Sequence, residues 1–241
     1  MFLPQDTARQ KITDLNITVS GCENYSITND SFNNKKLYGL IKEPHNNFEV
    51  SITGTAESGI GIFDEYFDDP YRFLILKAQT DLTKPGEKLN EYRKSLHLDE
   101  FYAPYDKALH IMRSLHETFQ YNPGVTEIHE TAENAFSLGK GVCQDYTHIM
   151  LSLLRSEKIP ARYVVGMMLG EGSSHAWVEA LCRGYWYGFD PTNNKLVNDE
   201  YIRVSCGRDS SDCSVIKGNF YGFTTQTQSE AVSVEEIITK D

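Results

Sequence analysis

The strongest constraint on the fold is an apolar helical stripe that begins directly after two closely spaced glycines. Gly139 and Gly141 precede Cys143, and the residues that follow repeat at helical spacing until Pro160. Glycine lets the backbone turn sharply, and apolar residues at this spacing are typical of a helix with one buried face. The stripe consists of Val142, Tyr146, Ile149, Met150, Leu153 and Leu154. The pattern therefore predicts a core-facing helix with Cys143 in its first turn.

The predicted position of Cys143 favours a reactive thiolate. Backbone N–H groups without intrahelical partners and the positive end of the helix dipole lie at a helix start, and both stabilise a negative charge. The thiolate is the nucleophilic form of cysteine. A buried, inert cysteine is the alternative, and it would be the better interpretation of an isolated cysteine. A thiol nucleophile also needs a base and a group that orients this base.

The base and the orienting group come from a predicted β-hairpin downstream. If Cys182 pairs with Tyr185 across the turn, His175 and Asp190 point to the same face as diagonal neighbours. A one-residue bulge would place them on opposite faces. The order cysteine, histidine, aspartate then gives a nucleophile, a general base and an orienting carboxylate. For Asp190, a turn carboxylate before Pro191 is the alternative interpretation.

Four motifs carry a resemblance to the transglutaminase-like core, and more narrowly to bacterial transglutaminase-like cysteine proteases. Together they resemble that family in order and spacing, over residues 107–221 and more weakly over the N-terminal third. They are Gly-Val-Cys-Gln-Asp-Tyr (141–146), Ile-Pro-Ala-Arg-Tyr-Val (159–164), Ser-His-Ala-Trp-Val-Glu (174–179) and Gly-Phe-Asp-Pro-Thr-Asn (188–193). The resemblance implies a papain-like catalytic core with Cys143, His175 and Asp190 as its triad.

Tyr121 and Asp145 are secondary candidates for a place near the site. The resemblance places the segment of Tyr121 near the active-site cleft, where its hydroxyl could donate to the reacting oxygen. A packing tyrosine at a helix end is the alternative. Asp145 follows the nucleophile near the predicted helix start, where a carboxylate favours the helix dipole, so we interpret it as a capping or orienting residue.

These residues predict acyl transfer through a thioester. Water as the second nucleophile makes the enzyme a protease or amidase, and an amine makes it a ligase or transglutaminase. The motif Gly-Val-Cys-Gln stands where animal transglutaminases carry Gly-Gln-Cys-Trp, so we expect hydrolysis of a peptide or amide substrate. A catalytically silent binding scaffold of the same fold is the non-enzyme alternative.

Composition argues against several other classes of protein function. The 241 residues carry a formal net charge of −11, which argues against nucleic acid or an anionic membrane as a partner. Five cysteines without paired spacing, and no visible secretory signal, favour a reducing cytoplasm. The spacing of Cys206 and Cys213 is unlike a zinc half-site, and we expect no metal and no cofactor. The sequence does not indicate the oligomeric state.

From these patterns we expect an α+β fold. An N-terminal antiparallel β region, residues 1–82, precedes a papain-like, transglutaminase-like core with a C-terminal strand, residues 83–241. We interpret the N-terminal region as a stabilising cap; a substrate-cleft wall or a partner module is the alternative. Expected strands lie at 12–19, 37–41, 48–55, 71–78, 162–169, 201–206 and 232–238, and the last is expected to return to the N-terminal sheet. Expected helices lie at 105–120 and 131–138. We expect a linker at 80–88 and a loop at 207–218.

Overall fold

A five-stranded antiparallel sheet forms the middle layer of the fold. The computed structural model describes residues 1–22, 24–59, 69–219, 225 and 227–237. The strand order in the sheet is β11-β10-β9-β7-β12, and all pairs are antiparallel. The strands are β7 (Ala161–Met168), β9 (His175–Cys182), β10 (Tyr185–Asp190), β11 (Lys195–Leu196) and β12 (Tyr201–Gly207). Strand β7 has a neighbour on each side, as its apolar pattern predicts.

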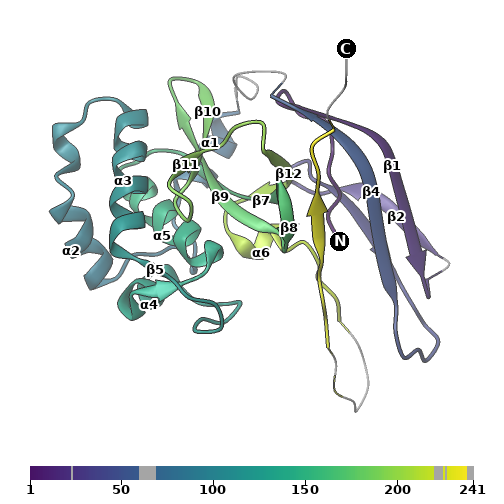
Figure 1. Cartoon of the computed structure of the whole chain (residues 1–241). Coiled ribbons are helices and arrows are strands. Elements are labelled where there is room, and N and C mark those ends of the chain that lie inside the picture. Colours follow the sequence, from purple (N-terminus) through teal and green to yellow (C-terminus); the bar gives the residue numbers. More distant parts are fainter. Residues whose placement is uncertain (23, 60–68, 220–224, 226, 238–241) are drawn as a thin grey trace.

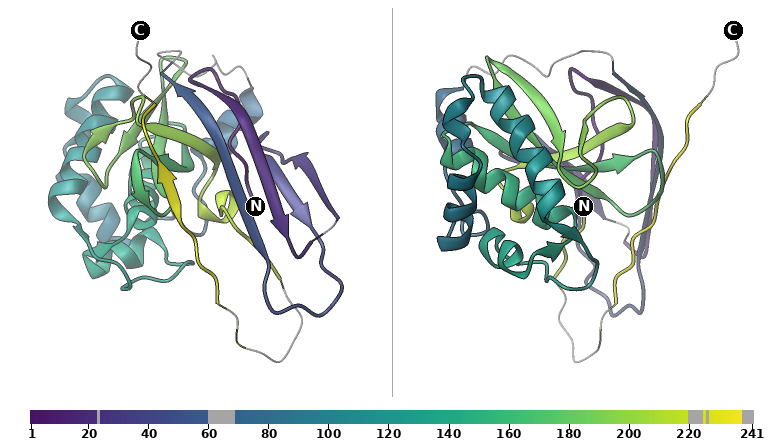
Figure 2. Two further views of the ribbon diagram at one scale, coloured as in Figure 1. Left: turned by 45° about the vertical axis from the view of Figure 1, so that its right-hand side comes forward. Right: turned by 60° about the vertical axis from the view of Figure 1, so that its left-hand side comes forward.

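Most of the helices cover one face of this sheet, and the N-terminal strands, together with the helix Pro70–Lys77, cover the other (Figure 1). Figure 2 shows the same layers from two other directions. On the helical side, Ala176, Val178 and Ala180 of β9 pack into one apolar core with helix α5. The helices are α1 (Pro70–Lys77), α2 (Glu87–Ser95), α3 (Pro104–Thr118), α4 (Ala132–Leu138) and α5 (Cys143–Ser156), with a 3-10 turn at Leu98–Glu100. The α+β class predicted from the sequence is confirmed.

The N-terminal strands form two antiparallel pairs. β1 (Gln10–Ser20) pairs with β4 (Glu49–Ser58), and β2 (Tyr25–Asn29) pairs with β3 (Lys35–Gly39). The β1–β4 register shifts between Thr13 and Asn16. The alternation of apolar and polar residues along β1 predicts this half-buried strand correctly.

Helix α5 begins where the sequence predicts it. Thr131 caps α4, and Gly139, at φ +69°, ends it in the left-handed conformation that favours glycine. The short strand β6 (Lys140–Gly141) then pairs in parallel with β5 (Gln120–Tyr121) and leads to Cys143, the first residue of α5.

Gly141 is required by its contact with the start of α5. A Cβ atom at this position would lie 2.3 Å from Asp145 Oδ2 and 2.8 Å from Asp145 Cγ. Since real Cβ atoms essentially never approach so closely, any side chain at position 141 would displace the Asp145 carboxylate. The second glycine of the motif therefore makes room for the Asp145 side chain in the first turn of α5.

The predicted strand at 71–78 is wrong, because this segment is helix α1. The Asp69 carboxylate accepts hydrogen bonds from the backbone N–H groups of Tyr71 and Arg72, and Pro70 occupies the first turn. These are strong start signals for a helix. The apolar run Tyr-Arg-Phe-Leu-Ile-Leu masks them, because a short apolar run fits a strand and a helix equally well.

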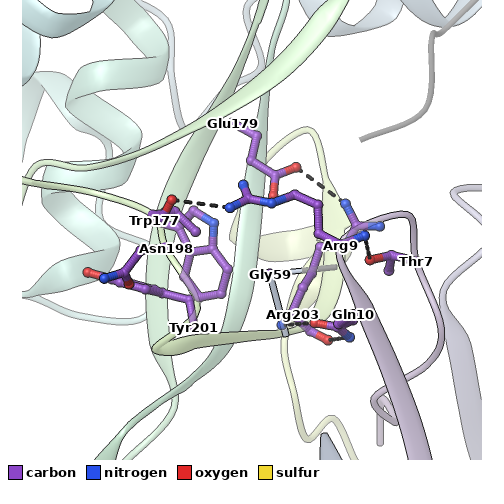
Figure 3. Close-up of a pocket in the computed structure, with 10 residues that line it drawn as sticks. Thr7, Arg9, Gln10, Gly59, Trp177, Glu179, Asn198, Tyr201 and Arg203 are labelled. Carbon is purple, nitrogen blue, oxygen red and sulfur yellow. Dashed lines mark hydrogen bonds and ion pairs between the residues drawn. The ribbon is translucent and has the colours of Figure 1, made fainter. Parts of the chain in front are cut away.

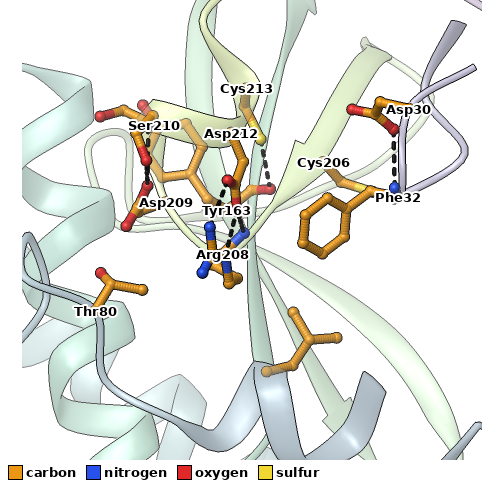
Figure 4. Close-up of polar contacts among 12 residues, drawn as sticks. Asp30, Phe32, Thr80, Tyr163, Cys206, Arg208, Asp209, Ser210, Asp212 and Cys213 are labelled. Carbon is orange, nitrogen blue, oxygen red and sulfur yellow. Dashed lines mark hydrogen bonds and ion pairs between the residues drawn. The ribbon is translucent and has the colours of Figure 1, made fainter. Parts of the chain in front are cut away.

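The C-terminal strand also differs from the expectation. β13 (Val232–Val234) pairs with β8 (Gly170–Gly172) of the core, not with the N-terminal sheet, and residue 238 lies outside the described residues. The predicted linker ends earlier, because α2 begins at Glu87. The predicted loop at 207–218 contains a helical turn, α6 (Ser210–Cys213), held by the Arg208–Asp212 ion pair (Figure 4). None of the helices within the described ranges has the length and apolar character needed to cross a membrane.

Candidate active site

Cys143 is the first residue of α5 and is partly exposed, whereas the other four cysteines are buried. Val142 is the N-cap residue in extended conformation. The N–H groups in the first turn of an α-helix have no intrahelical acceptor, and that of Cys143 is among them. The side chain therefore lies at the electropositive end of a helix of 14 residues.

Asp145 holds the turn that precedes α5. Its Oδ2 accepts from the Val142 N–H at 2.8 Å and from the Thr126 hydroxyl at 2.7 Å. Burial raises the pKa of Asp145, although both hydrogen bonds act in the opposite direction. The capping role predicted for Asp145 is confirmed by these contacts, which join the 122–130 loop to the start of α5.

The hairpin places His175 against Asp190. β9 and β10 pair in the predicted register, with Cys182 opposite Tyr185. His175 is the first residue of β9 and Asp190 is the last of β10. His175 Nε2 lies 2.8 Å from Asp190 Oδ2. The prediction that these two side chains share one face is confirmed.

Asp190 is fully buried and accepts five hydrogen bonds. Its Oδ2 accepts from His175 Nε2, Asn193 Nδ2 and the Tyr201 hydroxyl, each at 2.8 Å. Its Oδ1 accepts from the backbone N–H groups of Thr192 and Asn193 at 3.0 and 3.2 Å. Burial alone would raise the pKa of Asp190, but the donors and the nearby imidazole outweigh burial and lower it. The carboxylate is therefore ionised and fixed at neutral pH.

The His175 imidazole lies between Asp190 and Cys143. Burial lowers the pKa of His175, but hydrogen bonds to Asp190 and Cys143 and the negative charges of both groups outweigh it and raise the pKa to about 9. Since Nε2 is committed to Asp190, Nδ1 is the nitrogen left for the sulfur. The structure thus brings the three residues together, with an imidazolium favoured at neutral pH.

Tyr121 lies at the rim of the same site. It is in β5, beside Gly141, and its side chain is 58% exposed. Partial burial and then the charge of the Cys143 sulfur raise the pKa of Tyr121. Its hydroxyl is therefore within electrostatic reach of the nucleophile, and its role as a donor to the reacting oxygen stays a prediction.

The sequence does not predict two of the residues that contact Asp190. Asn193 is part of the Gly-Phe-Asp-Pro-Thr-Asn motif, and its position three residues after Asp190 could have indicated an amide that folds back on the carboxylate. Tyr201 has no such local signal. It reaches Asp190 because β12 and β10 belong to one sheet, and the strand order is not apparent from the sequence.

The described residues contain no cluster of three or more histidine, cysteine, aspartate or glutamate side chains suited to a metal ion.

We expect the His175–Asp190 pair to make the free energy of unfolding depend on pH. Because the His175 pKa is raised to about 9, its stabilisation is complete below about pH 6.5 and is lost as pH rises through about 9. Because the Asp190 pKa is lowered, its stabilisation is present above about pH 4 and is lost as pH falls through the folded value. In denaturant unfolding, the free energy of unfolding of the wild type should exceed that of His175→Gln by about 3 kcal/mol more at pH 6 than at pH 9.5. A difference independent of pH would contradict the ion pair.

The sequence matches a known family model over this region. Residues 99–191 match the model of the transglutaminase-like superfamily. An uncharacterized protein of Mycobacterium leprae is 41% identical over 112 residues, which are 42% of this chain and 40% of that protein. The chain thus matches less than half the length of that relative. An uncharacterized protein of Mycobacterium tuberculosis is 25% identical over 266 aligned positions, covering 96% of this chain and 82% of that protein.

Solved structures share the fold. A "Putative Cysteine Protease" from Cytophaga hutchinsonii superimposes with a TM-score of 0.76 over 98% of this chain and 84% of that chain, at 20% identity. The periplasmic domain of TgpA from Pseudomonas aeruginosa gives a TM-score of 0.50 over 74% of this chain and 63% of that chain, at 19% identity. At these identities the likeness shows the fold alone.

Proposed function

We propose that this chain, whose residues 99–191 match the model of the transglutaminase-like superfamily, is a thiol-dependent acyl-transfer enzyme that hydrolyses peptide or amide bonds. Cys143 is the nucleophile, His175 the general acid and base, and Asp190 the orienting carboxylate. The observation that carries the proposal is the 2.8 Å contact between His175 Nε2 and Asp190 Oδ2, with the Cys143 sulfur, at the start of α5, close enough to raise the pKa of the same imidazole.

The proposed first half-reaction forms a thioester. The Cys143 thiolate attacks the carbonyl carbon, and the electron pair of the C=O bond moves to the oxygen. The Cys143 N–H stabilises this oxyanion, and Tyr121 is the candidate second donor. The His175 imidazolium gives its proton to the leaving amine, the C–N bond breaks and the thioester remains.

The second half-reaction regenerates the enzyme. Neutral His175 accepts a proton from water, and the resulting hydroxide attacks the thioester carbonyl. The C–S bond breaks, a carboxylic acid leaves, and the thiolate and imidazolium are restored. Asp190 keeps the imidazole oriented through both steps and stabilises its charge, while its other four hydrogen bonds prevent it from rotating.

An amine that attacks the same thioester would give a transglutaminase or ligase, so the identity of the second nucleophile must be measured. We expect incubation with glutamine-containing peptides to release a free acid, and an added primary amine to leave the product unchanged. An amine adduct would favour transfer over hydrolysis. Mass spectrometry distinguishes the two products, and Cys143→Ala supplies the background. If neither product nor an acyl-Cys143 adduct forms with any peptide or amide tested, the silent scaffold becomes the better account.

We also propose a reducing compartment, the cytoplasm, as the site of action. All five cysteines are free, and four of them are buried. The nucleophilic sulfur must stay reduced to react. Retained activity of the purified protein after exposure to an oxidising glutathione buffer would contradict this proposal.

A further inference from the structure

The N-terminal region contacts the catalytic sheet at its edge strand, β12. The Gln10 side chain donates from Nε2 to the Arg203 carbonyl and accepts at Oε1 from the Arg203 N–H, both at 2.8 Å. Asn34 makes the same two-way contact with Cys206, also with both distances at 2.8 Å. Both amides are buried, with 3% and 2% of their surface exposed. They therefore supply β12 with the hydrogen bonds that a further strand would otherwise provide.

Two further contacts hold the segment that leads into β12. The Arg9 guanidinium donates to the Val197 carbonyl at 3.2 Å, and the Ser58 hydroxyl donates to the Asp199 carbonyl at 2.5 Å. All four contacts go to backbone atoms between residues 197 and 206. The N-terminal region thus fixes the path of the backbone on both sides of Tyr201, independently of the side chains that β12 carries.

Tyr201 connects β12 to the proposed catalytic carboxylate, Asp190. It is the first residue of β12 and is 4% exposed. Its hydroxyl donates to Asp190 Oδ2, the same oxygen that accepts from His175. Its ring packs edge-on against Trp177, with centroids 5.3 Å apart.

A small cavity of about 20 Å³ lies between the N-terminal region and this part of the sheet (Figure 3). Trp177 and Tyr201 line it from the catalytic side, and Thr7, Arg9 and Gln10 line it from the N-terminal side. Its size is about that of a single water molecule. The N-terminal region and the sheet are therefore in close contact next to His175 and Asp190. Removal of an N-terminal side chain that lines the cavity would change the packing against β12.

We propose that Tyr201 is a positioning residue for the catalytic carboxylate, and that Gln10 and Asn34 of the N-terminal region hold the strand that carries it. The inference deepens the proposed function, on whose triad it rests. It assigns the N-terminal region a part in the site: the amides fix β12, β12 fixes the Tyr201 hydroxyl, and the hydroxyl restrains Asp190 and takes up part of its negative charge.

The arrangement has a consequence that a purely structural role would not have. The groups that face His175 are Asp190 from β10, the Cys143 sulfur from α5, and Tyr201 and Trp177 from the sheet. Glu200 is the further charged group near the Tyr201 hydroxyl. A Tyr201→Phe variant keeps the ring but removes one of three donors to Asp190 Oδ2. The carboxylate then offers more charge to the imidazolium, so the His175 pKa should rise.

The test measures the titration of His175 directly. NMR of the full chain, with the His175 signal assigned by its loss in His175→Gln, should show a wild-type midpoint near pH 9. We expect Tyr201→Phe to raise the midpoint by about half a pH unit or more. Gln10→Ala should raise it less, and should add no further shift in the Tyr201→Phe background, because the two residues act along one path.

Matched controls separate this effect from a general loss of stability. Tyr92→Phe removes a hydroxyl that contacts Thr118, and Gln79→Ala removes an amide that contacts the Ser152 carbonyl, both away from β12. Neither should move the His175 midpoint. An unchanged or lowered midpoint in folded Tyr201→Phe overturns the role of Tyr201. If Gln10→Ala still shifts the His175 midpoint in the Tyr201→Phe background, the proposed coupling between the N-terminal region and Asp190 through Tyr201 is overturned.

The readout requires no turnover, so the two proposals fail separately. A shifted midpoint in a protein that forms no acyl-enzyme supports the positioning role and contradicts the proposed function. An unshifted His175 midpoint in a protein that hydrolyses amides supports the proposed function and contradicts the positioning role of Tyr201.

Discussion

Replacing His175 with alanine is expected to change the pH dependence of Cys143 alkylation by iodoacetamide. In the wild type, the imidazolium persists up to about pH 9, and its charge stabilises the thiolate. Without the imidazole this stabilisation is lost, so the alkylation rate of His175→Ala should be about tenfold or more below that of the wild type at pH 7, and the difference should shrink as the pH rises through 9. With a cleavable amide, kcat should fall by at least about 1,000-fold, since the base and the acid are lost together.

The other cysteines serve as internal references in this experiment. Burial and then Asp106 raise the pKa of Cys182 to about 12, and burial raises that of Cys213 strongly. Mass spectrometry of digested protein should therefore show alkylation concentrated at Cys143. His45→Ala changes an exposed histidine in the N-terminal region and should leave the profile unaltered. Parallel wild-type and His175→Ala profiles would show that the imidazole does not control the sulfur.

The parts of the site that the sequence predicts depend on local rules. The start of α5 follows from the glycines and from the apolar stripe behind Cys143. The contact of His175 with Asp190 follows from the register of one hairpin, because side chains alternate across a strand and a short turn fixes which residues pair. In each case the interacting residues are close in the chain, so their geometry is fixed before the rest of the protein is considered.

The parts that the sequence does not predict depend on pairings between distant segments. Gln10 and Arg203 are 193 residues apart, and Asn34 and Cys206 are 172 apart. Such contacts require the strand order of the sheet and the side on which the N-terminal strands pack. The same limit applies to β13, whose alternating pattern indicates a strand but not its partner β8. For helix α1 the strand prediction is wrong for a different reason. The helix-start signals at Asp69 and Pro70 are local, but the apolar run that follows them fits a strand equally well.

Arg155→Leu is expected to cause a large loss of stability although Arg155 is not one of the proposed catalytic residues. Arg155 lies in the last turn of α5 with 1% of its surface exposed. It donates to the Leu76, Ala161 and Arg208 carbonyls and to the Thr83 hydroxyl. Burial lowers its pKa to about 10, so the guanidinium is charged at neutral pH. Leucine would remove these four hydrogen bonds, three of which are buried, and although Thr83 Oγ1 keeps the Thr80 N–H as a donor, the loss should cost about 3–5 kcal/mol.

The contacts of Arg155 explain why this loss should reach the active site. They join α5 to α1, to β7 and to the turn at Arg208 that precedes α6. With one end of α5 anchored there and the other held by Asp145, the helix fixes Cys143 relative to the sheet that carries His175. Loosening the anchor should therefore slow Cys143 alkylation under conditions in which the variant is still folded.

Arg93→Ala provides the matched comparison. Arg93 pairs with Glu157, the residue directly after α5, but its side chain is 31% exposed. A partly exposed ion pair contributes about 1 kcal/mol or less, so this variant should lose little stability and should keep the wild-type alkylation rate. Urea unfolding monitored by circular dichroism measures both variants. If Arg155→Leu unfolded at the same urea concentration as Arg93→Ala, the buried arginine would not be the anchor of the catalytic helix, and the position of Cys143 would have to be fixed by Asp145 and the apolar face of α5 alone.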